Sequence, residues 1–272
     1  MKKILIHINY LRYGIRNKYI RPKLKYRDYP FSEDNVKRLS DFLASSGSDA
    51  AVAFVGLRQI KHSLGLEDPY TFMSQLLLDS FATVIVPTFT GNVLETGVFD
   101  VLRTPTENGT FSQLFLQQAD IRTLCPFKSY AVKGSRCQEI LALDTLNDYS
   151  PNGSFEYIHQ QDIVTINLGT IDTRPCCTHY AEFKSKLPYL LPRKVKVSVT
   201  DTRGETSTNE YFYLDNNMKI KLNLDKVERD LLKAGIARKL TINDMVARIL
   251  PEQKYFDYLL HQLKRDPYYL VY

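Results

Sequence analysis

The sequence predicts an α/β fold in which helices flank a mixed sheet. Two continuous apolar runs, residues 50–55 and 82–86, are typical of strands that are covered on both faces. Residues 69–78, which lie between them, have helical spacing of apolar side chains and begin with a proline, which suits the first turn of a helix. A strand, a helix and a strand in this order predict a β-α-β unit.

The following elements continue this alternation. Residues 4–9 predict a strand at the start of the chain, and residues 130–134 and 163–168 predict later strands of the sheet. Residues 136–143 predict a short helix between these two strands. The central part of the chain is therefore expected to build one sheet with helices against it.

The last third of the chain has a different pattern. Residues 195–200 alternate between apolar and polar side chains, as a half-exposed antiparallel strand does, and residues 210–214 predict its partner beyond a turn. Amphipathic spacing predicts three helices, over residues 225–234, 242–250 and 253–264.

Length and composition fit a single folded domain over residues 1–272. We expect residues 1–30 to form a basic N-terminal extension, and residues 190–272 to contribute antiparallel strands and C-terminal helices. No apolar run approaches the ~18 residues of a membrane-spanning helix, so no membrane span is expected. The four cysteines, two of them adjacent, do not form a spaced disulfide framework and indicate a cytoplasmic, reducing setting.

The net charge of +6 leaves the class of partner open. Nucleic acid, a membrane surface or a phosphorylated cofactor would each suit a basic protein, and excess lysine also simply raises solubility. Interspersed tyrosines would suit a nucleic-acid-binding module, but no helix-turn-helix or base-stacking pattern accompanies them. We therefore expect no nucleic-acid partner.

A histidine and a carboxylate stand three residues apart in the segment that begins at Cys176. If a helix begins here, His179 and Glu182 lie on the same helical face. Such a pair sets a near-neutral base beside a group that fixes its tautomer and stabilises its cation. The spacing also occurs by chance in many helices, so its weight depends on the motifs that accompany it.

Four further motifs share a fixed order with this pair. Residues 87–91 (Pro-Thr-Phe-Thr-Gly) end the second apolar strand, where open α/β sheets usually bind ligands. Residues 103–109 contain Thr-Pro-Thr and a following glycine, and residues 122–132 run from a loop into a strand through Cys-Pro-Phe-Lys-Ser. Residues 151–154 (Pro-Asn-Gly-Ser) precede an aromatic, helix-like segment. Taken singly, each motif is an ordinary turn.

Taken together, these motifs resemble the antibiotic N-acetyltransferase family, best known for the aminoglycoside 3-N-acetyltransferases. The resemblance extends from about Phe31 to Pro267, and Pro-Thr-Phe-Thr-Gly and His-x-x-Glu are its most specific parts. It implies an α/β fold distinct from that of the GNAT acetyltransferases. It also implies acetyl transfer from acetyl-CoA, as co-substrate, to a sugar amine, and no metal is expected.

The resemblance further implies roles for individual residues. His179 would accept the proton of the acceptor amine and Glu182 would orient its ring, with Asp215 as a further candidate for the acidic partner. Cys176 occupies the position of a threonine that is suited to stabilise the oxyanion. The implied cofactor-binding residues are Gly56, Leu57, Arg58, Thr88, Arg103, Thr104, Thr106 and Ser129, with Arg58, Arg103 or Lys61 near the CoA phosphates.

Three positions depart from the family pattern. Cys176 replaces the threonine and is a poor hydrogen-bond donor, and Cys125 replaces the histidine of a His-Pro pair. The turn at residues 54–58 lacks the serine that family members carry there. These changes favour a shifted acceptor and leave open an altered donor site.

The sequence thus predicts an acetyl-CoA-dependent N-acetyltransferase that acts on an amino sugar or an aminoglycoside, in antibiotic resistance or polysaccharide biosynthesis. Two alternatives stay open. Cys176 could pair with His179 in a cysteine-dependent acyltransferase, or the chain could be a catalytically altered CoA-binding relative in surface-polysaccharide biosynthesis. The expected partners are a CoA thioester and an amino-sugar acceptor, with a homodimer left open.

Overall fold

The computed structural model describes residues 26–216 and 221–272. The strand predicted over residues 4–9 and most of the predicted basic extension lie outside the described residues. The described end of that extension contacts α3 (Leu57–Leu64), where Asp28 Oδ1 lies 2.5 Å from His62 Nδ1.

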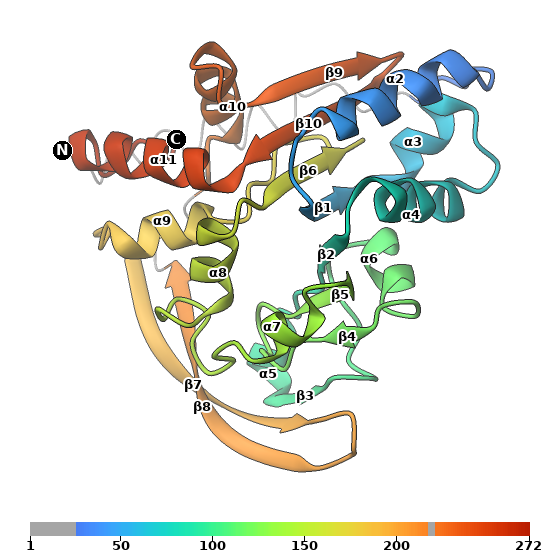
Figure 1. Cartoon of the computed structure of the whole chain (residues 1–272). Coiled ribbons are helices and arrows are strands. Elements are labelled where there is room, and N and C mark those ends of the chain that lie inside the picture. The colour runs from blue at the N-terminus through green and yellow to red at the C-terminus, as the bar shows by residue number, and fades with distance from the viewer. Residues whose placement is uncertain (1–25, 217–220) are drawn as a thin grey trace.

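Within the described residues, a seven-stranded mixed sheet forms the centre of the protein (Figure 1). Its central strands run parallel, and the outer ones pair antiparallel to their neighbours. This arrangement confirms the predicted mixed α/β fold. In spatial order the strands are β4 (Ile121–Arg122), β5 (Tyr130–Gly134), β2 (Thr83–Pro87), β1 (Ala50–Val55), β6 (Val164–Leu168), β10 (Met245–Pro251) and β9 (Arg238–Ile242).

Helices cover both faces of this sheet because its strands are apolar on both sides. Ala51 and Ile166 belong to the apolar core on one face, whereas Val52 and Ile85 belong to the core on the other. No helix of the described residues is long and apolar enough to cross a bilayer. The first face carries α2 (Glu33–Ala44), α3, α4 (Pro69–Ser80) and α6 (Thr110–Phe115), and the second carries α7 (Cys137–Leu141), α8 (Ser154–Gln160), α9 (Thr178–Lys184), α10 (Leu224–Lys233) and α11 (Glu252–Arg265).

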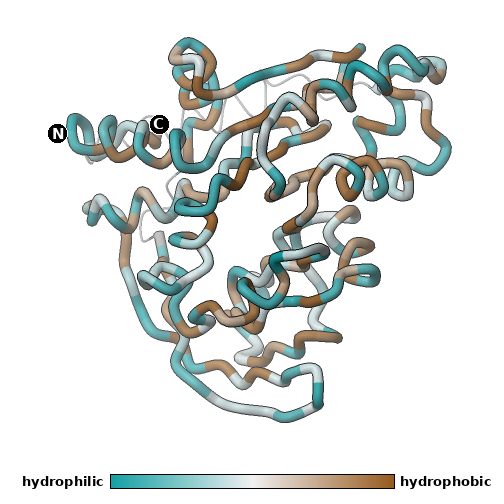
Figure 2. Tube along the Cα trace, viewed as in Figure 1, coloured by the Kyte–Doolittle hydropathy of each residue, from teal (hydrophilic) through white to brown (hydrophobic). Residues whose placement is uncertain are grey.

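The alternating segment in the last third forms a long antiparallel hairpin, as predicted. Strands β7 (Leu190–Thr200) and β8 (Thr206–Asn216) curve away from the main sheet, and β3 (Val98–Asp100) pairs with β7 (Figure 1). A short helix, α5 (Val93–Thr96), packs against this second sheet. Figure 2 shows hydrophilic residues at the far turn of the hairpin, where the Asp201 N–H donates to the Glu205 carbonyl at 3.0 Å.

The helix predicted over residues 242–250 is wrong: this segment belongs to a β-hairpin. Ile242 of β9 pairs with Met245 of β10, and Asn243, with φ of 52°, occupies the left-handed region that such tight turns require. β10 is inserted between β6 and β9 and is largely buried, so its nearly continuous apolar run follows from cover on both faces. A short apolar run does not distinguish a buried strand from a helix.

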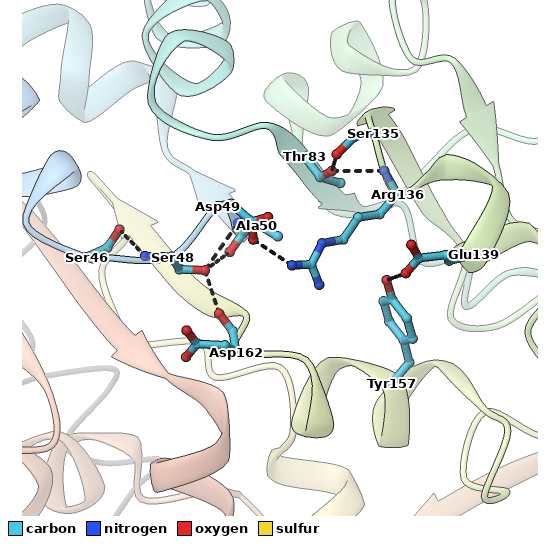
Figure 3. A network of polar contacts seen from close by, with 10 residues as sticks. All are labelled: Ser46, Ser48, Asp49, Ala50, Thr83, Ser135, Arg136, Glu139, Tyr157 and Asp162. Atoms are coloured by element: carbon cyan, nitrogen blue, oxygen red, sulfur yellow. Dashed lines mark hydrogen bonds and ion pairs between the residues drawn. The ribbon is translucent and has the colours of Figure 1, made fainter.

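A polar network joins the amino ends of the central strands (Figure 3). The Arg136 guanidinium donates to the Asp49 carboxylate at 2.6 Å, and its backbone N–H donates to the Thr83 hydroxyl at 3.1 Å. The Ser48 hydroxyl donates to the Asp162 carbonyl at 2.6 Å. These bonds hold together the segments that lead into β1, β2 and β6.

The opposite ends of β1 and β6 are joined through two glycines. The Gly56 N–H donates to the Leu168 carbonyl at 2.8 Å, and the Gly169 carbonyl lies so close that a Cβ on Gly56 would sit 2.2 Å from its oxygen. Gly169 also has φ of 63°, which favours glycine. Both positions therefore require the absence of a side chain.

We predict that Gly56→Ala lowers the free energy of unfolding by about 3 kcal/mol or more, because the clash is with backbone that cannot rotate away. Gly47→Ala is the control: a Cβ there meets nothing within 4 Å although φ is +74°, so only backbone strain of about 1 kcal/mol is expected. Urea unfolding of both variants provides the measurement. Equal losses in the two would show that steric contact at Gly56 is unimportant.

Candidate active site

The carboxyl ends of the three parallel strands meet at one edge of the sheet. Gly56 follows β1, Thr88 follows β2 and Gly169 follows β6. β2 lies on one side of β1 and β6 on the other, so the strand order reverses direction at β1. Open α/β sheets bind ligands in the crevice beside such a reversal.

Two adjoining cavities lie at this edge. The larger, of about 350 Å³, is lined by Gly56, the first turn of α3 and the start of α6. The smaller, of about 250 Å³, is lined in part by His179. Because the cavities share part of their lining, we describe them as one groove. The shared residues are Phe54, Asn108 and Arg174.

Helix α9 brings His179 and Glu182 together, as their spacing predicts. Nδ1 of His179 lies 2.7 Å from Oε2 of Glu182. The His179 side chain is 45% exposed and that of Glu182 is 2% exposed, so a buried carboxylate supports a ring that faces the groove. Because a carboxylate only accepts hydrogen bonds, Nδ1 carries the proton and Nε2 keeps its lone pair.

Tyr189 holds Glu182 from behind. Its hydroxyl donates to Oε1 of Glu182 at 3.0 Å, while Oε2 faces His179. Burial and the neighbouring Glu182 raise the pKa of Tyr189, so the phenol stays protonated and remains a donor. With a partner on each oxygen, the Glu182 carboxylate is fixed in one orientation.

A second buried carboxylate fixes the start of α9. Glu252, the first residue of α11, has no exposed surface and accepts the backbone N–H groups of Cys176 and Cys177, each at 2.9 Å. The Thr165 hydroxyl of β6 donates to the same carboxylate. Burial raises the pKa of Glu252, and these donors partly oppose that shift. The turn that precedes His179 is thereby joined to both β6 and α11.

Cys176 is buried in the wall of the smaller cavity. Its Sγ lies 3.3 Å from the Tyr130 hydroxyl. Burial and the nearby Glu252 raise the pKa of the Cys176 thiol, which disfavours the thiolate. A nucleophilic cysteine needs the opposite shift, so these surroundings suit a structural thiol.

A buried ion pair holds the loop between β6 and α9. Nε of Arg248 lies 2.9 Å from Oε2 of Glu228, and the two side chains are 7% and 13% exposed. The Arg248 guanidinium also donates to the carbonyls of Thr170 and Ile171, and Glu228 accepts from the Thr173 hydroxyl. This part of the groove wall is therefore anchored to β10 and α10.

Thr88 and Ser129, which the family resemblance implies at the cofactor, lie inside the fold. Neither has any exposed surface, and neither lines the groove. The Ser129 hydroxyl donates to the Thr88 carbonyl at 2.7 Å. Arg122 donates to the Ser129 hydroxyl and to the Thr88 carbonyl. The two residues thus shape the loop after β2.

The Thr-Pro-Thr turn also supports the groove from behind. The Thr104 carbonyl accepts from Arg122 at 2.6 Å, and the Thr106 hydroxyl donates to the Phe89 carbonyl at 3.3 Å. The Arg103 side chain is 89% exposed. Within the described parts of the chain, none of these three predicted cofactor residues lines the groove.

Gly56, Leu57 and Arg58 do line the larger cavity. They form the start of α3, whose first turn has no side-chain cap among the described residues. The Arg58 guanidinium lies 4.3 Å above the centre of the Tyr26 ring. Uncapped N–H groups, the helix dipole and an arginine together make this end of the groove suitable for an anion.

Asp215 is near the end of β8. On β8 it stands opposite Leu191 of β7, and its carboxylate lies 3.3 Å from Arg193. The carboxylate in contact with His179 is Glu182.

The structure adds groove residues that sequence reasoning did not assign. Asn108 accepts a hydrogen bond from the Phe89 N–H at 2.9 Å, and Lys128 and Arg174 line the smaller cavity. Asn108 and Lys128 fall within motifs that the sequence analysis had noted, so their place in those motifs was the available signal. Arg174 had no such signal, because only the path of the loop after β6 brings it to the groove.

A buried carboxylate, Asp148, lies close to the loop that carries Lys128. Asp148 is 4% exposed and accepts the Cys125 thiol at 2.6 Å and the Ser154 hydroxyl at 2.8 Å. Burial raises the pKa of Asp148 to about 6, although both donors oppose the shift. The Lys128 N–H donates to Cys125 Sγ at 3.3 Å. Cys125, which replaces the histidine of the family motif, thus has a structural partner of its own.

Solved structures that share this fold include the following three. The apoenzyme of aminoglycoside acetyltransferase AAC(3)-IVa has a TM-score of 0.67 at 19% identity, over 89% of this chain and 92% of that one. AAC-IIIb in its binary complex with CoASH has a TM-score of 0.67 at 17% identity, over 84% and 96%. The YokD protein of Bacillus subtilis has a TM-score of 0.67 at 16% identity, over 89% and 96%.

The fold, with half-exposed His179 and buried Glu182 at the carboxyl edge of its sheet, is that of the solved acetyltransferase AAC(3)-IVa. The sequence profile of the aminoglycoside 3-N-acetyltransferase family matches residues 59–264. The chain therefore belongs to the aminoglycoside 3-N-acetyltransferase family and is an N-acetyltransferase. No curated protein matches it by sequence.

We predict that Asp148→Asn flattens the dependence of stability on pH between about 4 and 6. A carboxyl whose pKa rises from 3.8 to about 6 on folding binds its proton more tightly in the folded state. Ionisation of Asp148 therefore lowers the free energy of unfolding as the pH rises through this window, by about 3 kcal/mol at most. Urea unfolding at several pH values measures the slope.

Asp79→Asn, on the exposed face of α4, is the control and should keep the wild-type slope. A wild-type slope in Asp148→Asn would mean that this carboxyl is not protonated on folding.

Proposed function

We propose that the protein transfers the acetyl group of acetyl-CoA to an amine of an amino sugar or aminoglycoside, with His179 as general base. The observation that carries the proposal is the buried Glu182 carboxylate, 2.7 Å from Nδ1 of a half-exposed His179 in a groove. An ammonium group is not nucleophilic, so the acceptor must lose a proton before or during attack. His179 Nε2 is the lone pair available to take it.

The reaction needs one proton path. The acceptor ammonium loses two protons in all, and one of them leaves to solvent. As the acceptor nitrogen bonds to the acetyl carbon and the carbon–sulfur bond of the thioester breaks, the other proton passes through His179 to the departing CoA sulfur. While the imidazole carries this second proton, the Glu182 carboxylate stabilises the cation. Tyr189 keeps that carboxylate in place, so the ring does not reorient between the two transfers.

The donor is assigned to the larger cavity. The uncapped start of α3 provides N–H groups there, and Arg58 provides positive charge for the CoA phosphates. The related AAC-IIIb is described with CoASH, and the related AAC-VIa with sisomicin. These two relatives, at 17% and 15% identity, support a CoA thioester and an aminated sugar as the substrate pair.

Asn108 is our candidate for stabilising the oxyanion, because Cys176 is a poor donor in the position where family members have threonine. The Asn108 Oδ1 accepts from the Phe89 N–H, which leaves its amide nitrogen as the donor where the two cavities join. A donor at this junction would meet the charge that develops on the thioester oxygen.

The cysteine-dependent alternative is less favoured. Burial raises the pKa of Cys176, whereas His179 already has a carboxylate partner that suits base catalysis. We also propose a cytoplasmic location, because acetyl-CoA is produced inside cells and all four cysteines are free thiols.

We predict that His179→Ala lowers kcat by about 10²–10⁴-fold, the usual contribution of a general base. Calorimetric titration should give an acetyl-CoA affinity close to wild type, since the histidine acts on the acceptor. Release of CoA thiol at saturating substrates measures kcat. Turnover within a few-fold of wild type would exclude His179 as the base, and a matched loss in Cys176→Ala would revive the thiol mechanism.

We predict that Glu182→Gln lowers kcat by about 10²-fold or more, because a neutral amide neither stabilises the imidazolium nor fixes the tautomer. Tyr189→Phe removes only the outer hydrogen bond and should cost less than about tenfold. The same thiol-release assay ranks the two variants. If Tyr189→Phe is the more damaging change, the carboxylate does not act through its charge on His179.

A further inference from the structure

The smaller cavity has a positive lining. Of the described residues that line it, Lys128 and Arg174 are cationic and none is a carboxylate. The rest of its lining is apolar, polar uncharged or His179 itself, and Glu182, behind that ring, is 2% exposed. A ligand in this cavity therefore meets two positive charges and no exposed negative one among the described residues.

Neither cation has a carboxylate within 4.0 Å among the described residues. The Lys128 ammonium lies 4.5 Å above the Phe89 ring, and no described carboxylate lies within 4.0 Å of its Nζ. The nearest acidic cluster centres on Asp148, whose oxygens already accept from Cys125 and Ser154. Burial lowers the pKa of Lys128, which is the response of an ammonium that has lost water without gaining a full partner.

Arg174 is in a similar position. Its backbone N–H donates to Asn167 Oδ1 at 2.8 Å, which fixes the main chain, while the exposed guanidinium stands where the two cavities join. A fixed main chain, and a guanidinium that bonds to no other side chain among the described residues, suit bidentate binding of a phosphate or carboxylate.

A polycationic acceptor fits this cavity poorly. Several ammonium groups would approach Lys128 and Arg174 at close range, where like charges repel strongly because little water separates them. An acceptor with one amine and one anionic group would instead place the amine at His179 and the anion on Lys128. Phe54, Phe89 and Phe155, also in the lining, offer flat apolar surface to a sugar ring.

We infer that the natural acceptor is an amino sugar that carries an anionic group, phosphate or carboxylate, held by Lys128 with Arg174, and not a polycationic drug. The inference rests on the proposed acetyl transfer and names its substrate class. Of the two cavities, Lys128 lines only the smaller one, whereas Arg174 lines both. A substitution of Lys128 should therefore change binding of the acceptor without changing binding of acetyl-CoA.

The test is a comparison of kcat/KM by release of CoA thiol from acetyl-CoA. The acceptors are glucosamine, glucosamine 6-phosphate, a 2-amino-2-deoxyuronic acid and sisomicin. We expect the highest kcat/KM with one of the two anionic sugars, and the choice between them identifies phosphate or carboxylate. The advantage should shrink as ionic strength rises.

Lys128→Met keeps the apolar stem and removes the charge. It should raise KM for the favoured anionic sugar by about tenfold or more, the effect of deleting one partner of a close charge pair. KM for glucosamine and for acetyl-CoA should stay near wild type. Lys128→Glu should reverse the preference toward sisomicin. Lys37→Met, which removes an exposed lysine on α2 with a 73% exposed side chain, is the matched control and should change nothing.

Two results would overturn the inference while leaving acetyl transfer intact. The first is a kcat/KM that is highest with sisomicin. The second is a Lys128→Met variant whose kcat/KM falls equally for every acceptor, or whose KM for acetyl-CoA rises. Either form of the second result would assign Lys128 to the thioester. Failure of the proposed function itself looks different: no thiol release with any acceptor and no heat of binding with acetyl-CoA.

Discussion

The carboxylate of Glu252 is the interaction on which the geometry of the active site depends. It is fully buried and has no cationic partner within 4.0 Å among the described residues, so its charge is met by the N–H groups of Cys176 and Cys177 and by the Thr165 hydroxyl. A buried carboxylate is costly unless its lone pairs are satisfied, and here they are satisfied by the turn that must be fixed. The position of α9, and with it His179, follows from this contact.

Two buried arginines, Arg122 and Arg248, fix other parts of the groove wall. Arg122 donates hydrogen bonds to the Thr88 and Thr104 carbonyls behind the loop after β2. Arg248 donates to the Thr170 and Ile171 carbonyls in the loop after β6. In each case a guanidinium satisfies backbone acceptors that loops would otherwise leave unpaired inside the protein. Loops between strand ends and helices are thereby held as firmly as the strands, which is what a site that orients two substrates requires.

The residues that depart from the family motifs change the surroundings of the His179–Glu182 pair and leave the pair itself in place. Cys125 bonds to Asp148 and Cys176 contacts Tyr130, so each replacement has a partner in the core. The groove next to His179 contains Lys128 and Arg174, and its charge differs in sign from what a polycationic acceptor would need. In the proposed mechanism, the proton chemistry and the recognition chemistry are carried by different residues, so one can change without the other.

The sequence by itself determined the alternation of strands and helices, the β7–β8 hairpin and the adjacency of His179 and Glu182, because these depend on local spacing. The order of its motifs also determined the family. It did not determine that residues 245–251 form a strand, since a short apolar run has the same pattern in a buried helix.

Only the tertiary structure decided which motif residues face the groove. Thr88 and Ser129 turn inward because Arg122 binds them, and Asp215 pairs with Arg193 at the open end of the hairpin. Glu252 reaches the site through a contact with a residue distant in the chain, the bond from the Cys176 N–H. Arg174 stands in a loop that the distant Arg248 holds through the Thr170 and Ile171 carbonyls. Which side a loop residue faces depends on the long-range partner that satisfies it, and that partner is not encoded in local spacing.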